Sequence, residues 1–285
     1  MSNKKKISFC ITCKGRLEHL KQTLPENLKN TERYPNVEFV VLDYDSQDGL
    51  EEWIRKNYQP LIDSGKIRYT KYTPAPEFQM AHAKNMAHRV ATGEILCNLD
   101  ADNIVHRHFA GWLNKQFSEN PNIYIRPSDL LVQTKRLVGD PQRGASGRIA
   151  IHRDNFMRLH GYNQNFKGWG NDDGEFVSRA DHAGLTGVPM PWYMVGHVLQ
   201  HSNEKRIENL DEESKKTSGA LLNSSRLSRF AKMTVSLSSS LSVNPDGDFG
   251  CGKVRINFKE DVTLEPHIDK NYNRTLRQSS PRLSR

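Results

Sequence analysis

Apolar residues gather in three short runs in the first hundred positions of the chain, and polar residues follow each run. The runs are Ile7–Thr12, Val37–Leu42 and Glu94–Leu99. Their length and nearly continuous apolar character are typical of strands buried on both faces of a parallel sheet. We therefore predict three parallel strands with polar residues at their carboxyl ends.

Between these runs, apolar residues recur every three or four positions, which predicts helices. The predicted helices are Leu17–Leu28, Asp48–Tyr58, with Asp48 as its cap, and Ala81–Ala91, which stops at Thr92-Gly93. Alternating strands and helices predict an α/β fold, an open sheet flanked by helices that binds ligands at the carboxyl ends of its strands.

The character of the chain changes after about residue 213, where serine becomes frequent. Apolar residues with a period of two lie in Val235–Val243 and Val254–Phe258, on either side of the turn-forming Asn244–Gly247. We predict a small β-hairpin or meander followed by a frayed basic end. The predicted division is an α/β domain of residues 1–213 and a C-terminal β-rich extension of residues 214–285.

Composition and charge argue against a membrane-spanning or a disulfide-rich protein and limit the expected partners. Charged residues make up 26% of the 285 residues, and no apolar run approaches the roughly 20 residues that cross a bilayer. Four scattered cysteines do not form a disulfide framework, so we predict a cytoplasmic protein. Residues from 216 onward carry +6 of the net charge of +8. This basic tail is compatible with contact to the inner face of a membrane or to a partner protein, and equally with a solvated surface; nucleic acid is not an expected partner.

Two acidic clusters are the candidates for chemistry. Asp100 and Asp102 follow the third strand, where paired carboxylates can share a divalent cation, although two acids in a turn are common. Asp172, Asp173 and Glu175 follow a Gly-Trp-Gly sequence. A carboxylate near an apolar ring can act as a base, and the alternative is an acidic helix start that favours the helix dipole.

Taken together, these segments resemble family 2 type glycosyltransferases with the GT-A fold. More specifically, they are similar to the metal-dependent β-1,4-galactosyltransferases and their bacterial relatives. The resemblance covers residues 7 to about 205. The segments that carry it are Ile11–Leu20, Asp43–Gly49, Ala83–Asn85 with Ala91–Asp102, Gly147–Arg179 and His201–Lys205.

The resemblance implies roles for single residues. Asp102 and His201 are the implied metal ligands, and Asp100 is implied to contact the ribose, or the metal through water. The implied base is Asp173, with Asp172 beside it in the acceptor site. The residues implied to line the nucleotide-sugar site are Thr12, Arg16, Asp43, Asp45, Lys84, Asn85, Asp100, Gly147 and Trp169.

Two positions depart from the family pattern. The family's Glu-Asp-Asp-Asp run is replaced by Asp172-Asp173-Gly174-Glu175, so the choice of base among Asp172, Asp173 and Glu175 stays open. Val198 stands where galactosyltransferases have a methionine ligand, which leaves the identity of the metal open.

The implied activity is a metal-dependent, inverting transfer of a sugar from a nucleotide-diphosphate donor of the UDP-Gal or UDP-GalNAc type to a glycan or other hydroxyl. Mn²⁺ is expected in preference to Mg²⁺. Two alternatives remain: a sugar nucleotidyltransferase, and a non-catalytic protein that binds nucleotide sugars or glycans. A glycosyltransferase releases a nucleoside diphosphate, whereas a nucleotidyltransferase releases pyrophosphate, so the released product distinguishes these two functions.

Overall fold

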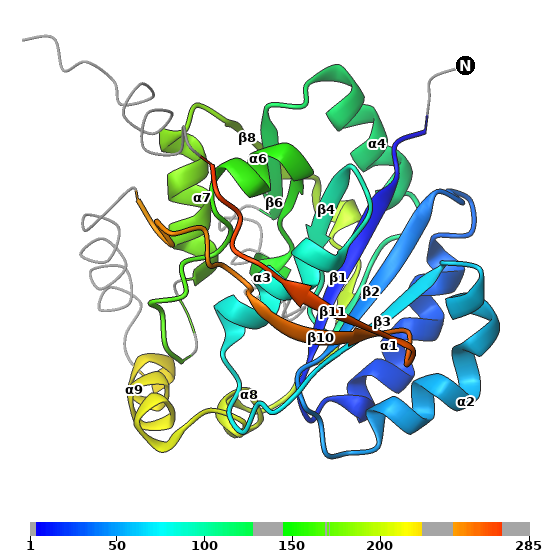
Figure 1. The fold of residues 1–285 in the computed structure, drawn as a ribbon. Coiled ribbons are helices and arrows are strands. Elements are labelled where there is room, and N and C mark those ends of the chain that lie inside the picture. Colours follow the sequence, from blue (N-terminus) through cyan, green and yellow to red (C-terminus); the bar gives the residue numbers. More distant parts are fainter. Residues whose placement is uncertain (1–3, 128–144, 169, 171, 224–241, 270–285) are drawn as a thin grey trace, which may run out of the picture.

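The structure is a computed structural model that describes residues 4–127, 145–168, 170, 172–223 and 242–269. Within these residues, one mixed sheet has the strand order β11-β10-β3-β2-β1-β4-β7-β6-β8, and β5 pairs with β9 separately (Figure 1). The strands are β1 (Ile7–Cys13), β2 (Val37–Asp43), β3 (Ile67–Tyr72), β4 (Ile95–Asn98), β5 (Asn103–Ile104), β6 (Ile123–Pro127), β7 (Ala150–His152), β8 (Thr186–Met190), β9 (His197–Val198), β10 (Gly252–Ile256) and β11 (Glu260–Leu264). The helices are α1 (Leu17–Asn30), α2 (Leu50–Asp63), α3 (Met80–Val90), α4 (Phe109–Glu119), α6 (Arg153–Arg158), α7 (Asp172–His182), α8 (Asn203–Ile207) and α9 (Glu212–Asn223).

The first half of the sheet is parallel and has the predicted architecture. β1 pairs with β2 on one side and β4 on the other, and β3 continues the parallel set. The three predicted strands are confirmed as β1, β2 and β4, and the three predicted helices as α1, α2 and α3. Because β1, β2 and β4 run in the same direction, the polar residues that follow them meet at one edge of the sheet.

The prediction that Asp48 caps the second helix is wrong. α2 begins at Leu50 after Gly49, and no side chain caps it. Asp48 instead accepts a hydrogen bond, 2.8 Å long, from the backbone nitrogen of Leu17. Leu17 is the first residue of α1. The carboxylate therefore satisfies a free N–H at the start of a different helix, and so ties the turn after β2 to the turn after β1.

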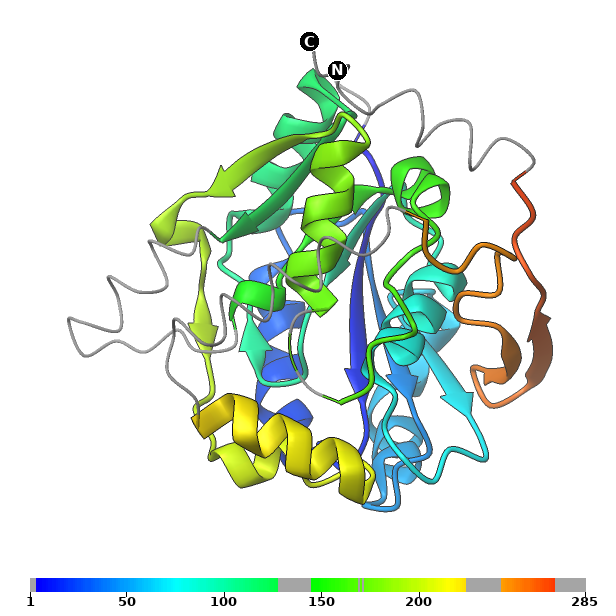
Figure 2. The same ribbon diagram turned by 90° about the vertical axis from the view of Figure 1, so that its left-hand side faces the viewer.

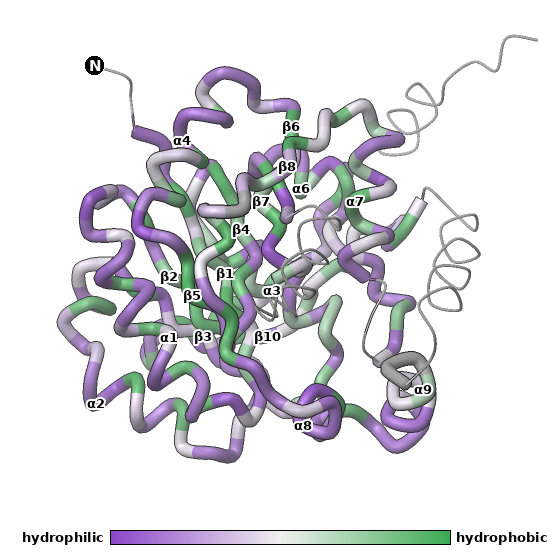
Figure 3. The backbone as a smooth tube through the Cα atoms, turned by 180° about the vertical axis from the view of Figure 1, so that it is seen from behind, coloured by the Kyte–Doolittle hydropathy of each residue, from purple (hydrophilic) through white to green (hydrophobic). Residues whose placement is uncertain are grey.

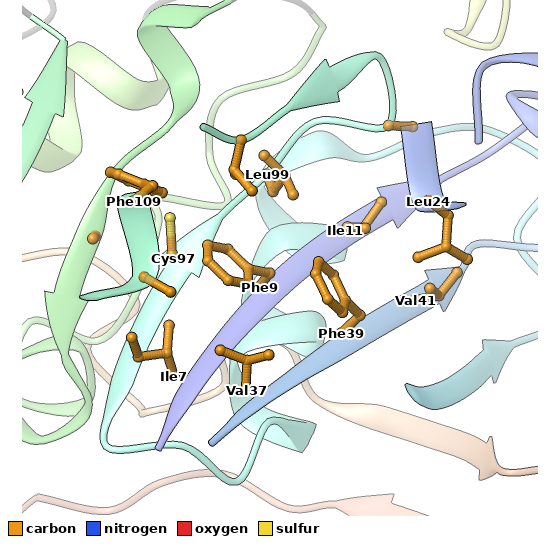
Figure 4. Packing of buried hydrophobic residues seen from close by; sticks show 14 of the residues in the cluster. Ile7, Phe9, Ile11, Leu24, Val37, Phe39, Val41, Cys97, Leu99 and Phe109 are labelled. Atoms are coloured by element: carbon orange, nitrogen blue, oxygen red, sulfur yellow. The ribbon is translucent and has the colours of Figure 1, made fainter. Parts of the chain in front are cut away.

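Apolar residues cover both faces of the sheet. On one face, Phe9 and Phe39 stack at 5.3 Å between ring centroids and pack with the apolar sides of α1, α2 and α4 (Figure 4). On the other face, Cys10 and Val40 pack beneath α3, α6 and α7. In Figure 3 the central strands are largely hydrophobic, whereas α1 and α2 alternate between hydrophilic and hydrophobic residues. A sheet buried on both faces explains the continuous apolar runs.

The C-terminal hairpin lies elsewhere in the chain than predicted. β10 and β11 are joined at Asn257 and Phe258, both of which have positive φ, while Asn244–Gly247 forms a separate turn. β10 also pairs with β3, so the hairpin extends the main sheet (Figure 2). Val235–Leu241 and the basic end from residue 270 lie outside the described residues.

Two short helices close one end of the molecule. α8 and α9 lie at the end where β1 terminates, as both views show (Figures 1 and 2). The predicted domain boundary at residue 213 falls within α9. No helix among the described residues is long and apolar enough to span a membrane.

Candidate active site

A cavity of about 350 Å³ opens at the carboxyl ends of β1 and β4, where most of the predicted site residues converge. It is the place at which an open α/β sheet binds its ligand. The predicted residues that line it are Thr12, Arg16, Lys84, Asp100, Asp102, Gly147, Asp172, Asp173 and His201. The lining residues that the sequence did not single out include Lys14, Phe78, Met80, Arg126, Ser146, Arg206 and Asn209.

Asp102 and His201 form a direct pair, although 99 residues separate them. The short ribbon of β5 and β9 joins the two segments, and Leu199 donates its backbone hydrogen to the carbonyl of Asp102 at 2.8 Å. His201 Nε2 then lies 2.9 Å from Asp102 Oδ2. Burial by itself raises the pKa of Asp102, but hydrogen bonds from His201 and Asn103 bring the pKa below its ordinary value.

A buried arginine supports this pair from behind. Arg148 is 1% exposed, and its guanidinium donates to Asn103 Oδ1 at 2.5 Å and to the carbonyl of Val195. The side-chain nitrogen of Asn103 in turn donates a hydrogen bond to Asp102 Oδ1 at 2.6 Å. Both carboxylate oxygens of Asp102 are therefore held, one by the asparagine and one by the histidine.

Asp100 lies beside Asp102 in the same cavity, close to Gly147. Burial, reinforced by Asp102 and Asp173 against the pull of Lys84, raises the pKa of Asp100 to about 7. A Cβ on Gly147 would lie 3.0 Å from Asp173 Oδ2 and 3.1 Å from Asp100 Oδ2. The absence of a side chain at Gly147 thus lets two acids from different segments come near each other.

Lys84 holds the two acids at the start of α7. Its Nζ lies 2.6 Å from Asp172 Oδ2 and 2.7 Å from Asp173 Oδ1, and the lysine side chain is 2% exposed. The side chain of Asp173 is 26% exposed against 7% for Asp172, so Asp173 is the more accessible acid. Burial and Asp172 raise the pKa of Asp173, while Lys84 opposes this rise.

Two other predicted residues lie away from the cavity. Glu175 is buried in an ion pair with Arg179 at 2.5 Å, and this arginine also donates to the carbonyls of Leu159 and Gly161. Asn85 exchanges hydrogen bonds with the backbone of Tyr162. In both cases the polar side chain fixes α7 or α3 to a neighbouring loop.

The turn after β2 also stands back from the cavity wall. Asp43 is buried and accepts hydrogen bonds from Tyr69 Oη at 2.6 Å and from the backbone of Ser46. Asp45 accepts from the backbone of Ala75 at 3.0 Å. Trp169 lies outside the described residues.

The Asp102–His201 pair fits a divalent cation. No group of three or more His, Cys, Asp or Glu side chains among the described residues is arranged to enclose a metal ion. One oxygen and one imidazole nitrogen already face each other at 2.9 Å, and Asn103 fixes the orientation of the carboxylate. Such a site leaves most coordination positions to water and phosphate oxygens, as cations that bind nucleotide phosphates commonly require.

The sequence matches two family models. The model described as glycosyl transferase family 2 matches residues 8–144, and the model described as the N-terminal domain of galactosyltransferase matches residues 138–204. Together they take in the parallel half of the sheet and the segment that carries Gly147, Asp173 and His201. A comparison with curated protein sequences finds no match.

Solved structures with similar folds are glycosyltransferases. The mannosyltransferase PcManGT from Pyrobaculum calidifontis, in complex with GDP-Man and Mn²⁺, has a TM-score of 0.61 and 17% identity, over 86% of this chain and 67% of its own. GalNAc-T7 with UDP, GalNAc and Mn²⁺ has a TM-score of 0.56 and 19% identity, over 70% of this chain. This chain spans 44% of the length of GalNAc-T7, and at these identities the likeness shows the GT-A fold. The family models and the fold identify the chain as a glycosyltransferase in which a family 2 segment is followed by a galactosyltransferase-like segment.

Proposed function

We propose that this enzyme transfers a sugar from a UDP-galactose or UDP-N-acetylgalactosamine donor to a hydroxyl of a glycan acceptor, with inversion at the anomeric carbon. The observation that carries the proposal is that the same cavity holds both the Asp102–His201 pair and an accessible carboxylate, Asp173. The match to the galactosyltransferase model supports the choice of sugar. GalNAc-T7, whose fold is similar, contains UDP and GalNAc.

Asp102 and His201 are the proposed ligands of the divalent cation, and Asp100 lies beside them. When bound, the cation supplies positive charge that neutralises the leaving diphosphate. The imidazole nitrogen in the ligand pair favours Mn²⁺ over Mg²⁺, because Mg²⁺ prefers oxygen ligands. Asn103 and Arg148 keep Asp102 in one orientation, which lowers the cost of assembling the site.

Asp173 is the proposed base. The acceptor hydroxyl gives its proton to a carboxylate oxygen of Asp173 while the acceptor oxygen forms a bond to the anomeric carbon. The bond between that carbon and the diphosphate oxygen breaks, and its electron pair leaves with the nucleoside diphosphate. Attack on the face opposite the leaving group inverts the configuration. Thr12, Arg16 and Lys84 line the same cavity and are proposed to contact the donor or to orient the acids around it.

The test is a donor panel of UDP-Gal, UDP-GalNAc and GDP-Man, each with Mn²⁺, with Mg²⁺ and with a chelator, against a set of oligosaccharide acceptors. We expect release of UDP with Mn²⁺ and a product whose anomeric configuration, read by NMR, is opposite to that of the donor. Asp102→Asn should lose this activity, and the matched surface variant Asp261→Asn should keep it. Absence of nucleoside diphosphate release from every donor, or release of pyrophosphate from a nucleoside triphosphate, would overturn the proposal.

A further inference from the structure

Arg206 lies on α8, in the wall of the cavity, and part of its guanidinium lacks a hydrogen-bond partner. Two of its nitrogens, Nε and Nη2, are buried without a hydrogen-bond acceptor. Burial also lowers the pKa of Arg206, while the negative charges of Asp102 and Asp100 act in the opposite direction. Leaving a buried charged donor unpaired costs free energy, so a side chain in this state is suited to a ligand that brings acceptors.

Three of the other basic side chains that line the cavity already have protein partners. Lys14 Nζ donates to the backbone carbonyls of Tyr44, Asp45 and Ala75. Arg16 pairs with Glu208 and donates to the carbonyl of Lys205. Lys84 bridges Asp172 and Asp173. Each of these groups would have to give up a protein partner in order to bind an anion, whereas Arg206 has two buried nitrogens with none to give up.

The placement of Arg206 relative to the metal ligands identifies the kind of ligand. His201 lies five residues before Arg206 on the same segment, and the side chain of Ser202 between them caps α8 by accepting from the backbone nitrogen of Lys205 at 3.2 Å. One short segment thus carries both a proposed metal ligand and an unpaired guanidinium. A ligand that reaches both must be rich in oxygen and negatively charged over several ångströms, as a diphosphate is.

We propose that Arg206 binds the diphosphate of the nucleotide-sugar donor directly and stabilises the negative charge that develops on the leaving nucleoside diphosphate. The inference rests on the proposed function and adds a residue to it. The planar guanidinium offers paired donors that match two phosphate oxygens, which an ammonium group does not. Arg206 acts beside the Asp102–His201 pair, so the diphosphate is held from two sides.

The experiment compares binding of UDP and of uridine, in the presence of Mn²⁺, by isothermal titration calorimetry. Arg206→Gln should weaken UDP binding by about 10- to 100-fold, the range expected for loss of hydrogen bonds to a charged group, and should leave uridine binding unchanged. Arg206→Lys keeps the positive charge but loses the paired N–H donors of the guanidinium. Its affinity for UDP should lie between those of the wild type and Arg206→Gln. Arg158→Gln is the matched control, because Arg158 also has a buried unpaired Nε but does not line the cavity.

Each outcome has a definite reading. Equal UDP affinity in wild type and Arg206→Gln would overturn the inference while leaving the proposed function intact. Equal losses for UDP and uridine would also overturn it, because they indicate a general collapse of the cavity. If the melting temperature shows that Arg206→Gln is not folded, the same two comparisons apply to Arg206→Lys. If the wild-type protein binds neither UDP nor GDP with Mn²⁺, the proposed function itself fails.

Discussion

Gly147 offers a sharp test of the arrangement of the acids, because one added methyl group reaches both sides of the cavity. A Cβ at this position would lie 3.0 Å from Asp173 Oδ2 and 3.1 Å from Asp100 Oδ2, closer than nine in ten real contacts of a Cβ. Each carboxylate must therefore move by a few tenths of an ångström. The backbone of Gly147 does not have positive φ, so alanine introduces no backbone strain.

The magnitude follows from the cost of misplacing a catalytic group. A displacement of about 1 Å can lower a rate by about 100-fold, so a shift of a few tenths should lower kcat/KM of Gly147→Ala by about tenfold. The free energy of unfolding should change by only about 1 kcal/mol or less, because no buried group loses a partner. The assay is nucleoside diphosphate release across donor and acceptor concentrations, alongside urea unfolding.

Gly111→Ala is the control for the same substitution. Gly111 lies on the exposed face of α4, and nothing is within 4 Å of a Cβ there. Alanine in a helix should raise stability by about 0.5–1 kcal/mol and leave kcat/KM unchanged. Wild-type kcat/KM in Gly147→Ala would refute the claim that the working enzyme needs a residue without a side chain between Asp100 and Asp173.

Four further outcomes are expected. Asp102→Asn and His201→Ala should each remove the Mn²⁺-dependent rise in melting temperature that UDP produces, as measured by thermal shift. Asp173→Asn should bind UDP like the wild type in calorimetry but lose turnover by about 10²- to 10⁴-fold; full turnover would contradict its role as base. Glu175→Gln should lower the free energy of unfolding by about 3 kcal/mol, because it removes the counter-charge of a buried arginine, with normal kcat in the folded fraction; a loss of kcat without destabilisation would return Glu175 to the active site. Arg148→Lys should weaken Mn²⁺ binding by about tenfold in a metal titration, because it loosens the support of Asp102; unchanged affinity would mean that Asn103 alone suffices.

Three of the parallel strands, β1, β2 and β4, were predictable because their signal is local, whereas β3 was not predicted. β1, β2 and β4 are buried on both faces, and burial of that kind leaves unbroken apolar runs in the sequence. The hydrogen bond from the backbone of Leu17 to the Asp48 carboxylate was not predictable, since it depends on how closely the turns after β1 and β2 approach in space. The period of two at Val254 and Ile256 predicted a strand, but it carries no information on which strand becomes the neighbour.

The site was less predictable from local pattern than the fold. Asp102 and His201 meet through β5 and β9, which are two residues each and too short to leave a periodic signal. Their pairing was expected only through a family resemblance. The ion pair of Glu175 with Arg179 did have a local signal, since the two residues are four positions apart on a helix. That spacing favours a structural role for Glu175 and leaves the base to Asp172 or Asp173.

In the proposed reaction, Lys84 is the counter-ion of the acid that acts as the base, Asp173. Burial and the adjacent Asp172 raise the pKa of Asp173, which makes its carboxylate a better proton acceptor. The ammonium of Lys84, 2.7 Å away, opposes that rise because it stabilises the charged carboxylate. Once Asp173 accepts a proton, Lys84 still has Asp172 at 2.6 Å as its counter-ion. In the proposed reaction the lysine is therefore not left as an unpaired buried charge, and the role we assign to Asp172 needs no contact with the acceptor.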